Sequence, residues 1–255
     1  MEKVISSAIL ENYNQKLNEN LDVNTAIVGG GPSGLICAYK LAKAGIKVAL
    51  FESKLALGGG IWGGAMMFNK VVIQNEAVKF LDELSINYQR ENEDIVVADS
   101  IELASALIYN ANHAGAALFN NITAEDIILK NDRVSGIVIN WTSVLKNGLH
   151  VDPLMVQSKN VLDATGHPSA ISNIAIRKAG VSLNTPSGGV EGEKPMWAEL
   201  GEELTVKHSK EIFPGLFVSG MAANGVSGSF RMGPIFGGMM LSGAKIADII
   251  IENEK

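Results

Sequence analysis

The sequence predicts an α/β fold, a Rossmann-like doubly wound parallel sheet with a small β-rich insertion. Three observations favour it. A strand, a helix and a second strand follow one another near the N-terminus; an apolar strand late in the chain runs into a glycine-rich loop; and a pair of alternating strands interrupts the middle. A length of 255 residues fits one domain, 1–255, with the insertion around 116–160.

The elements are expected in the following order. Residues 1–21 form a partly amphipathic helix that packs on the domain through Val4, Ile5, Ile9, Leu17 and Leu21. A βαβ unit follows, with strand 25–29, helix 32–44 and strand 47–52, and then an apolar glycine-rich loop, 57–69.

The rest of the chain continues the alternation. The predicted elements are helices 74–86 and 100–114, an antiparallel hairpin of 127–130 with 134–140, strand 161–163, a helix from about 169, a polar loop 182–195, strand 216–220 and helix 237–253.

Composition restricts the class of partner. Hydrophobic residues make up 47% and charged residues 19% of the chain, as in an ordinary globular protein. The net charge of −6, without a Lys/Arg cluster, argues against nucleic acid and anionic membranes as partners. No apolar run reaches the roughly 20 residues of a membrane span, and no signal peptide is evident. A cytoplasmic location is therefore expected.

A dinucleotide site is predicted at Gly29, Gly31 and Gly34, which fit the pattern G-x-G-x-x-G between a strand and a helix. These glycines permit a tight turn, approach of a pyrophosphate to the backbone, and close packing of helix on strand. Glu52 ends the next strand 23 residues after Gly29, where a carboxylate can accept both hydroxyls of an unphosphorylated ribose. This arrangement is typical of the glutathione-reductase type of dinucleotide-binding fold. The alternative is a purely structural glycine turn.

The same glycine pattern introduces both NAD and FAD proteins. In flavoproteins of this build a late strand usually ends in Gly-Asp, and the aspartate holds the flavin. Here the late strand ends in LFVSGMAANG, with Met221 at that position. Because a thioether is a poor hydrogen-bond acceptor, Met221 disfavours FAD.

A metal site is a hypothesis for the segment GLHVDP, 148–153. If this run is extended, His150 and Asp152 share one face and Val151 points into the core. His167 ends the apolar run VLDATG, a position where open α/β sheets carry functional side chains. Imidazole and carboxylate suit iron(II), manganese or zinc. Spacing alone favours a satisfied polar pair or a surface loop over a metal site.

Other polar and reactive side chains allow two interpretations each. Arg231, beside a glycine-rich turn, could bind a carboxylate through two hydrogen bonds or could form a surface ion pair. Cys37 is the only cysteine, which excludes an intrachain disulfide, and it is expected to be buried. His113 is interpreted as structural, and His208 as a residue that a surface strand could carry.

Four motifs together give the chain a family resemblance: LGGGIWGGAMMFN, HVDP, DATGH and FRMGPIFGGMMLSGAK. In this order they resemble the thiamine-thiazole synthases, transferases that build adenosine-diphosphate thiazole from NAD and glycine. The resemblance extends from Thr25 to the final helix.

The resemblance implies a role for individual residues. Ser33, Glu52, Ser53 and Gly60 would contact the ADP-ribose part of NAD, and Ala124 would line the adenine pocket. His150, Val151, Asp152 and Met221 would approach the ribose and pyrophosphate. Asp152 and His167 would hold iron(II), and Arg231 would bind the carboxylate of glycine. The sites would lie at subunit contacts of a homo-oligomer, an octamer.

The resemblance also bears on the source of sulfur. Some members of the family carry, in place of His150, a cysteine that gives up its sulfur in a single turnover. Because His150 contains no sulfur and Cys37 is expected to be buried, the chain resembles the group that uses free sulfide and iron(II) and turns over repeatedly. His150 could then move protons near neutral pH, together with Asp152 and His167 as the catalytic set.

Three other functions remain open on the residues alone. They are a flavin-dependent oxidoreductase of the same build, a nucleotide-binding sensor or scaffold in which the histidines are structural, and a ribose-phosphate isomerase.

Overall fold

The computed structural model describes all 255 residues and contains an eight-stranded central sheet. Six strands follow the order β11-β12-β9-β1-β2-β6, and β8 pairs with both β9 and β7. The strands are β1 (Asp22–Val28), β2 (Val48–Glu52), β6 (Ala117–Asn120), β7 (Ile122–Lys130), β8 (Arg133–Trp141), β9 (Leu154–Asp163), β11 (Lys210–Phe213) and β12 (Leu216–Val218). The predicted doubly wound α/β fold is confirmed.

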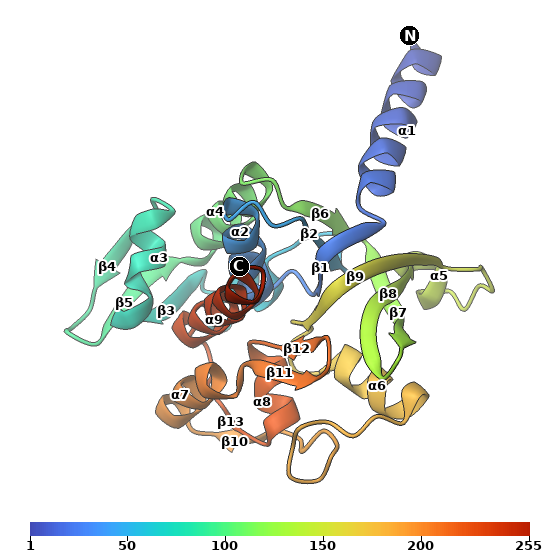
Figure 1. Ribbon diagram of the computed structural model, residues 1–255. Helices are drawn as coiled ribbons and strands as arrows, with labels where there is room; N and C mark the ends of the chain where they lie inside the picture. Colours follow the sequence, from blue (N-terminus) through green and yellow to red (C-terminus); the bar gives the residue numbers. More distant parts are fainter.

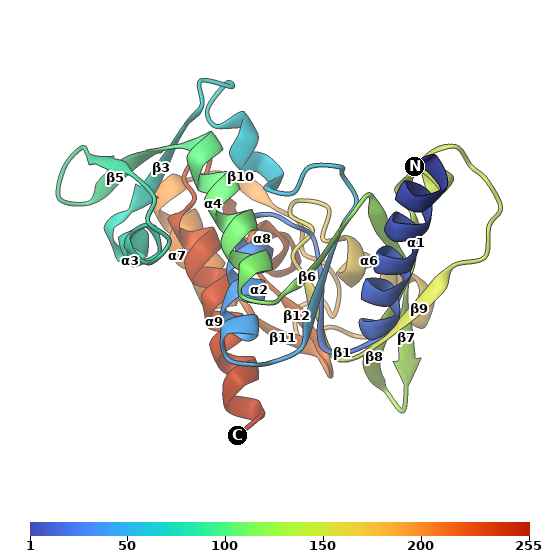
Figure 2. The same ribbon diagram turned by 90° about the horizontal axis from the view of Figure 1, so that it is seen from above.

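Helices cover both faces of this sheet. Figure 2 shows α2 (Pro32–Lys43), α4 (Ser100–His113) and α9 (Gly237–Asn253) together on one side, and α6 (Ala170–Ala179) on the other with the β7–β8 hairpin. One hydrophobic cluster lies beneath α2, α4 and α9, and a second lies between the hairpin, α6 and β12. Each face of the parallel strands is therefore packed, which is why β2 and the last four residues of β1 are continuously buried rather than alternating.

Strand β9 belongs to both parts of the sheet. Its first half pairs antiparallel with β8, from Leu154 opposite Ile139 to Gln157 opposite Gly136. Its second half runs parallel to β1 as far as Asp163 opposite Val28. The predicted hairpin is thereby joined to the core without a break, and the predicted strand 161–163 is only the end of a ten-residue strand.

A second, three-stranded antiparallel sheet was not predicted. It has the order β3-β5-β4, with β3 (Lys70–Gln74), β4 (Tyr88–Arg90) and β5 (Ile95–Asp99), and lies at the left of Figure 1 beside α3 (Val78–Glu83). The predicted helix 74–86 is confined to α3 and the preceding 3-10 turn η2 (Asn75–Ala77). These strands are only three to five residues long, too short for their alternation to compete with a helical pattern.

The N-terminal helix α1 (Glu2–Glu19) forms as predicted but does not pack along the domain. Figure 1 shows it projecting away from the sheet, with the N-terminus at its tip. Only its last turns touch the domain: Tyr13 stacks on Trp141, and Lys16 Nζ donates to the Leu118 carbonyl at 2.6 Å. The expected packing through Val4, Ile5 and Ile9 is wrong for this chain by itself, because these side chains are 67%, 51% and 64% exposed.

The C-terminal third of the chain contributes short strands and helices that pack beside the central sheet. Between α6 and α7 (Ala198–His208) runs the predicted polar loop, which ends in the short strand β10 (Lys194–Met196) paired with β13 (Phe230–Arg231). Helix α8 (Met221–Ser227) follows β12. His208 ends helix α7 instead of lying in a strand, and its Nδ1 is 2.6 Å from Ser229 Oγ.

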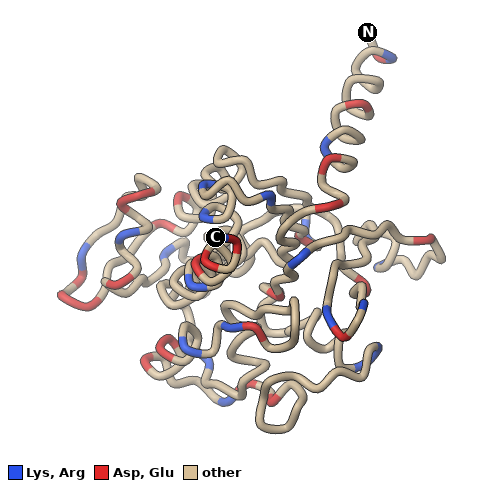
Figure 3. The backbone as a smooth tube through the Cα atoms, viewed as in Figure 1, with Lys and Arg blue, Asp and Glu red and all other residues tan.

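Figure 3 shows that Lys and Arg alternate with Asp and Glu along the whole chain. None of the helices is both long enough and apolar enough to cross a membrane.

Candidate functional site

A cavity of about 560 Å³ lies at the carboxyl ends of the parallel strands β1, β2 and β9. This is the edge at which open α/β sheets bind their ligands, and the volume is in the range of small-molecule sites. Its lining includes most of the residues predicted to bind the dinucleotide, which are Gly29, Gly31, Ser33, Glu52, Ser53, Gly60, Ala124 and Met221.

The glycine loop has the geometry that its pattern predicts. Gly29 has φ +108°, and a Cβ there would lie 2.2 Å from the Ala164 carbonyl oxygen. A Cβ on Gly34 would lie 2.1 Å from the Gly29 oxygen, so this glycine allows α2 to pack against the loop. A Cβ on Gly31 would meet nothing within 4 Å and would enter the cavity. The space above Gly31 and the N-terminus of α2 is therefore open to an anionic group.

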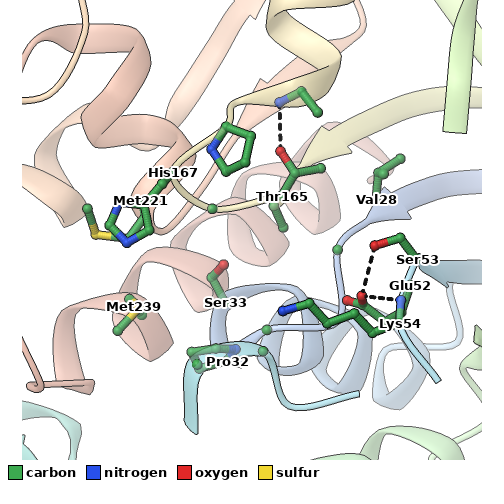
Figure 4. A pocket seen from close by; sticks show the side chains of 18 of the residues that line it. Val28, Pro32, Ser33, Glu52, Ser53, Lys54, Thr165, His167, Met221 and Met239 are labelled. Atoms are coloured by element: carbon green, nitrogen blue, oxygen red, sulfur yellow. Dashed lines mark hydrogen bonds between the residues drawn. The ribbon is translucent and has the colours of Figure 1, made fainter. Parts of the chain in front are cut away.

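Glu52 is only 6% exposed and ties the end of β2 to the glycine loop. Its Oε2 accepts from Gly30 N at 2.8 Å, and its Oε1 accepts from Lys54 N at 2.8 Å and from Ser53 Oγ at 3.2 Å (Figure 4). A carboxylate offers about four lone-pair positions, so Oε2 retains one for a ligand hydroxyl. The prediction of a ribose-binding carboxylate fits this position, and the carboxylate also holds the loop in shape.

Lys54 was not singled out from the sequence. It lines the cavity, and Figure 4 shows its side chain extending toward Pro32 and Ser33 at the start of α2. A lysine at this point can place a positive charge beside a phosphate.

The turn after β9 is held by the buried carboxylate of Asp163. Its Oδ1 accepts from Thr165 Oγ1 at 2.7 Å, and its Oδ2 accepts from Ser172 N and Oγ at 2.9 and 2.8 Å. Thr165 Oγ1 in turn accepts from Ala170 N at 2.7 Å, at the start of α6. This network fixes the path of the chain that carries His167 to the cavity. The signal for this role in the sequence is the acidic residue that ends the apolar strand in DATGH.

His167 meets two side chains that lie far from it in the sequence. Its Nδ1 lies 2.7 and 2.9 Å from the two carboxylate oxygens of Glu193, in the loop before β10. Arg231 also lines the cavity, and its Nε is 4.0 Å from Glu193 Oε2. Figure 4 shows His167 and Met221 on one side of the cavity and Glu52 and Ser53 on the other. Glu193 was missed, because nothing in its polar loop marks it in the sequence.

The segment of His150, Val151 and Asp152 does not reach this cavity in its own chain. All three residues are exposed in a loop between α5 (Thr142–Lys146) and β9. Val151 is 49% exposed, so the expectation that it points into the core is wrong. The pairing of β9 with β8 begins only at Leu154, so no neighbouring strand lies beside residues 150–152 to bury Val151.

A metal would find few ligands within one chain. No group of three or more His, Cys, Asp or Glu side chains is arranged to hold an ion. Cys37 is fully buried in α2, as predicted, and burial raises the pKa of its thiol well above the usual range. His113 stacks on Tyr109 at the end of α4, away from the cavity.

Comparison with known proteins addresses the chain as a whole. The family model described as "Thi4 family" matches residues 6–236. The chain belongs to the Thi4 family. The thiamine thiazole synthase of Thermococcus kodakarensis is 53% identical over 248 residues, which cover 97% of this chain and 96% of the relative. The resemblance to the thiamine-thiazole synthases is confirmed.

Solved structures agree with this assignment to the Thi4 family. The crystal structure of Thermovibrio ammonificans THI4 has a TM-score of 0.98 and 51% identity, and the match covers 100% of this chain and 98% of that one. A geranylgeranyl bacteriochlorophyll reductase-like protein of Thermoplasma acidophilum matches with a TM-score of 0.52 at 16% identity, over 91% of this chain and 79% of that one. The second likeness concerns the fold alone. This Thi4-family chain is an enzyme, with thiamine thiazole synthase function in thiamine biosynthesis.

Proposed function

We propose that the chain converts NAD, glycine and free sulfide into an adenosine-diphosphate thiazole carboxylate and nicotinamide, with iron(II) and through repeated turnovers. The observation that carries the proposal is the one cavity that joins the glycine loop and Glu52 to His167 and Arg231, with Glu193 directly behind these two side chains. A dinucleotide needs the first group, and chemistry on its opened ribose needs the second.

The lining of the cavity supports NAD as the dinucleotide. Glu52 accepts a hydroxyl of the adenosine ribose, and Ala124, in β7, lines the adenine end. The pyrophosphate lies over Gly31, where backbone N–H groups and the positive end of α2 face it. The nicotinamide ribose then extends toward His167.

The proposed reaction begins with cleavage of the N-glycosidic bond. The bonding electron pair leaves with nicotinamide, whose pyridinium becomes neutral, and water adds to the ribose carbon. The ADP-ribose opens and isomerises to a ketone, which condenses with the amino group of glycine and loses water. Arg231 holds the glycine carboxylate through a pair of hydrogen bonds, so that the amine is placed next to the ketone.

Iron(II) would be held by His167 and Asp152. The two supply an imidazole nitrogen and a carboxylate, a donor pair that suits iron(II) and leaves several positions open. When bound, the ion would act as a Lewis acid and would bring sulfide next to the reacting carbon. The proposed source of sulfur is external, because His150 has no sulfur and the Cys37 thiol is buried.

We propose that the site is completed by a second copy of the chain in a homo-oligomer. His150, Val151 and Asp152 are exposed and lie outside their own chain's cavity, which supports delivery to a neighbour's His167. The exposed apolar side chains of α1 and of Leu149 and Leu154 offer surface that such contacts would bury.

An anaerobic assay with NAD, glycine, sulfide and iron(II), read by mass spectrometry, tests the reaction. We expect an adenylated thiazole in excess over enzyme when sulfide is present, and none when it is omitted. A product limited to one equivalent, or one formed equally without sulfide, would refute the proposed sulfur source. Intact NAD after incubation would refute the reaction itself.

Mixing two inactive variants tests whether the metal site is formed by residues of two different chains. His167→Ala and Asp152→Ala should each abolish thiazole formation and retain NAD binding, whereas His113→Ala serves as a control on α4. If one chain supplies His167 and another supplies Asp152, a co-assembled mixture of the two variants regains about a quarter of the wild-type activity. A mixture as inactive as its components would contradict a site shared between chains.

A further inference from the structure

Glu193 does not line the cavity itself, but it is the carboxylate that lies against both His167 and Arg231, which do. Its side chain is 18% exposed. Both of its oxygens lie within hydrogen-bond distance of His167 Nδ1, at 2.7 and 2.9 Å, and Oε2 is 4.0 Å from Arg231 Nε. Three segments distant in the sequence therefore meet at one side chain.

The backbone on each side of Glu193 is fixed to the segment around α8. Gly192 N donates to the Gly225 carbonyl at 2.9 Å, and Lys194 N donates to the Ser229 carbonyl at 2.9 Å. The position of the carboxylate is thus set by the fold, although the residue lies in a loop that the sequence marks only as polar. A carboxylate held in this way can select the orientation of its partner.

The contact determines which nitrogen of His167 is free. An ionised carboxylate only accepts hydrogen bonds, so the neutral imidazole that faces it carries its proton on Nδ1. All the hydrogen bonds of His167 go through Nδ1, and Nε2 keeps its lone pair. Histidines that bind metals use this arrangement, in which a carboxylate behind the ring sets the tautomer and orients the ring.

We propose that Glu193 is a positioning residue, which fixes His167 with Nε2 as the free electron-pair donor and directs the Nε edge of Arg231 away from substrate. The inference deepens the proposed function and rests on it for the identity of the ligands. For Arg231, the 4.0 Å separation makes the contact weaker, and the terminal guanidinium nitrogens remain available for a carboxylate.

The tautomer of His167 can be measured without metal or activity. The chain has four histidines, so a protein labelled with ¹⁵N-histidine gives few imidazole signals in magic-angle-spinning NMR, and the His167→Ala spectrum assigns the relevant one. At a pH where the ring is neutral, we expect Nδ1–H in the wild type and a mixture of tautomers in Glu193→Ala. The control Glu191→Ala removes a carboxylate two residues away that bonds to Ser187 N, and should leave the tautomer unchanged.

Cobalt(II), a spectroscopic substitute for iron(II), measures the consequence for ligand binding. We expect Glu193→Ala to bind cobalt(II) about 10- to 100-fold more weakly than the wild type. In Glu193→Ala the glycine KM should rise and the affinity for NAD should be unchanged. In the control Glu191→Ala, the cobalt(II) affinity, the glycine KM and the NAD affinity should all equal those of the wild type.

The outcomes separate this inference from the proposed function. A wild-type His167 that carries its proton on Nε2, or a Glu193→Ala variant with unchanged tautomer and cobalt affinity, overturns the role of Glu193. Failure of the wild type to bind cobalt(II) through His167 overturns the proposed metal site, while the NMR result still decides whether Glu193 sets the tautomer. If Glu193→Ala does not fold, the wild-type spectrum alone is decisive.

Discussion

Gly31 and Gly34 lie three positions apart in the glycine loop, and the surroundings of an added methyl group differ sharply between them. At Gly34 the methyl would lie 2.1 Å from the Gly29 oxygen, so Gly34→Ala should lower the free energy of unfolding by about 1–3 kcal/mol. At Gly31 it would project into the empty cavity, and Gly31→Ala should change that free energy by less than about 1 kcal/mol. Urea unfolding of the two variants measures the contrast.

Gly31→Ala should instead affect ligand binding. The methyl occupies the space where the pyrophosphate would approach the backbone, so NAD affinity should fall about tenfold or more, a loss of about 1.4 kcal/mol or greater. Calorimetric titration with NAD is the measurement. If Gly31→Ala binds NAD as tightly as the wild type, the phosphates lie elsewhere in the cavity.

Arg231→Lys tests whether a planar, forked donor is needed for glycine. Lysine keeps the charge but cannot form the paired hydrogen bonds, so the glycine KM should rise about tenfold while the NAD KM stays constant. Arg90→Lys, on the exposed strand β4, is the matched control. An unchanged glycine KM in Arg231→Lys would remove Arg231 from the glycine site.

Single residues differed in how well the sequence predicted them. Glu52 and the three loop glycines could be placed because strand, helix and spacing are local signals. Asp163 and Glu193 could not, because their importance comes from partners 9 to 38 residues away that only the folded chain brings together.

Among the elements, the junction of α7 with α9 contains a buried acid. Glu202 accepts from Gly238 N at the start of α9 at 2.5 Å and from Gln74 Nε2 of β3, while its Oε1 has no partner. Burial raises the pKa of Glu202 above its usual value. The folded state therefore binds this proton more tightly than the unfolded state, and the stability due to the group is present at acid pH and is lost as pH rises through the raised pKa.

Glu202→Gln should remove this pH dependence. Relative to wild type, the free energy of unfolding of the variant should increase between pH 4.5 and pH 8, because the amide stays neutral and can donate to the unpartnered Gln74 Oε1. Urea unfolding at several pH values is the measurement, with Glu203→Gln on the exposed side of α7 as control. A constant difference across this range would show that Glu202 is ionised without penalty.

Elements were predictable where a pattern persists over a whole helix or hairpin. Helices α2, α4 and α9 and the β7–β8 hairpin agree with their predicted positions within a few residues, except that β7 begins at Ile122. Strands β3, β4 and β5 pair only with one another and through Val72 with Ile235, so no long alternating run marks them.

At the scale of the whole molecule, the exposed apolar side chains of α1 lead to a prediction about the oligomeric state. Its first turns present Ile5 and Ile9 to solvent in the single chain, an arrangement that a neighbouring copy would bury. Ile5→Ser combined with Ile9→Ser should shift the mass measured by light scattering toward the 27.1 kDa of one chain. Asn14→Ser, on the same helix and also exposed, should not. An unaltered mass in the double variant would exclude these turns of α1 from the contacts.

The overall architecture followed from the sequence because a βαβ unit and a late apolar strand are enough to specify a doubly wound sheet. The placement of 148–153 did not, because the periodicity of a single chain carries no information about surfaces that another copy would cover.

Strand β9 has a consequence for how a ligand reaches the cavity. Because one uninterrupted strand pairs with β8 at its start and with β1 at its end, the hairpin cannot swing open without breaking the central sheet. Admission of a dinucleotide would then depend on other segments, such as the 57–69 loop, whose Gly59 and Gly60 line the cavity and whose Met66, Met67 and Asn69 all adopt positive φ. We expect that segment to rearrange first, with the hairpin acting as its stationary counterpart.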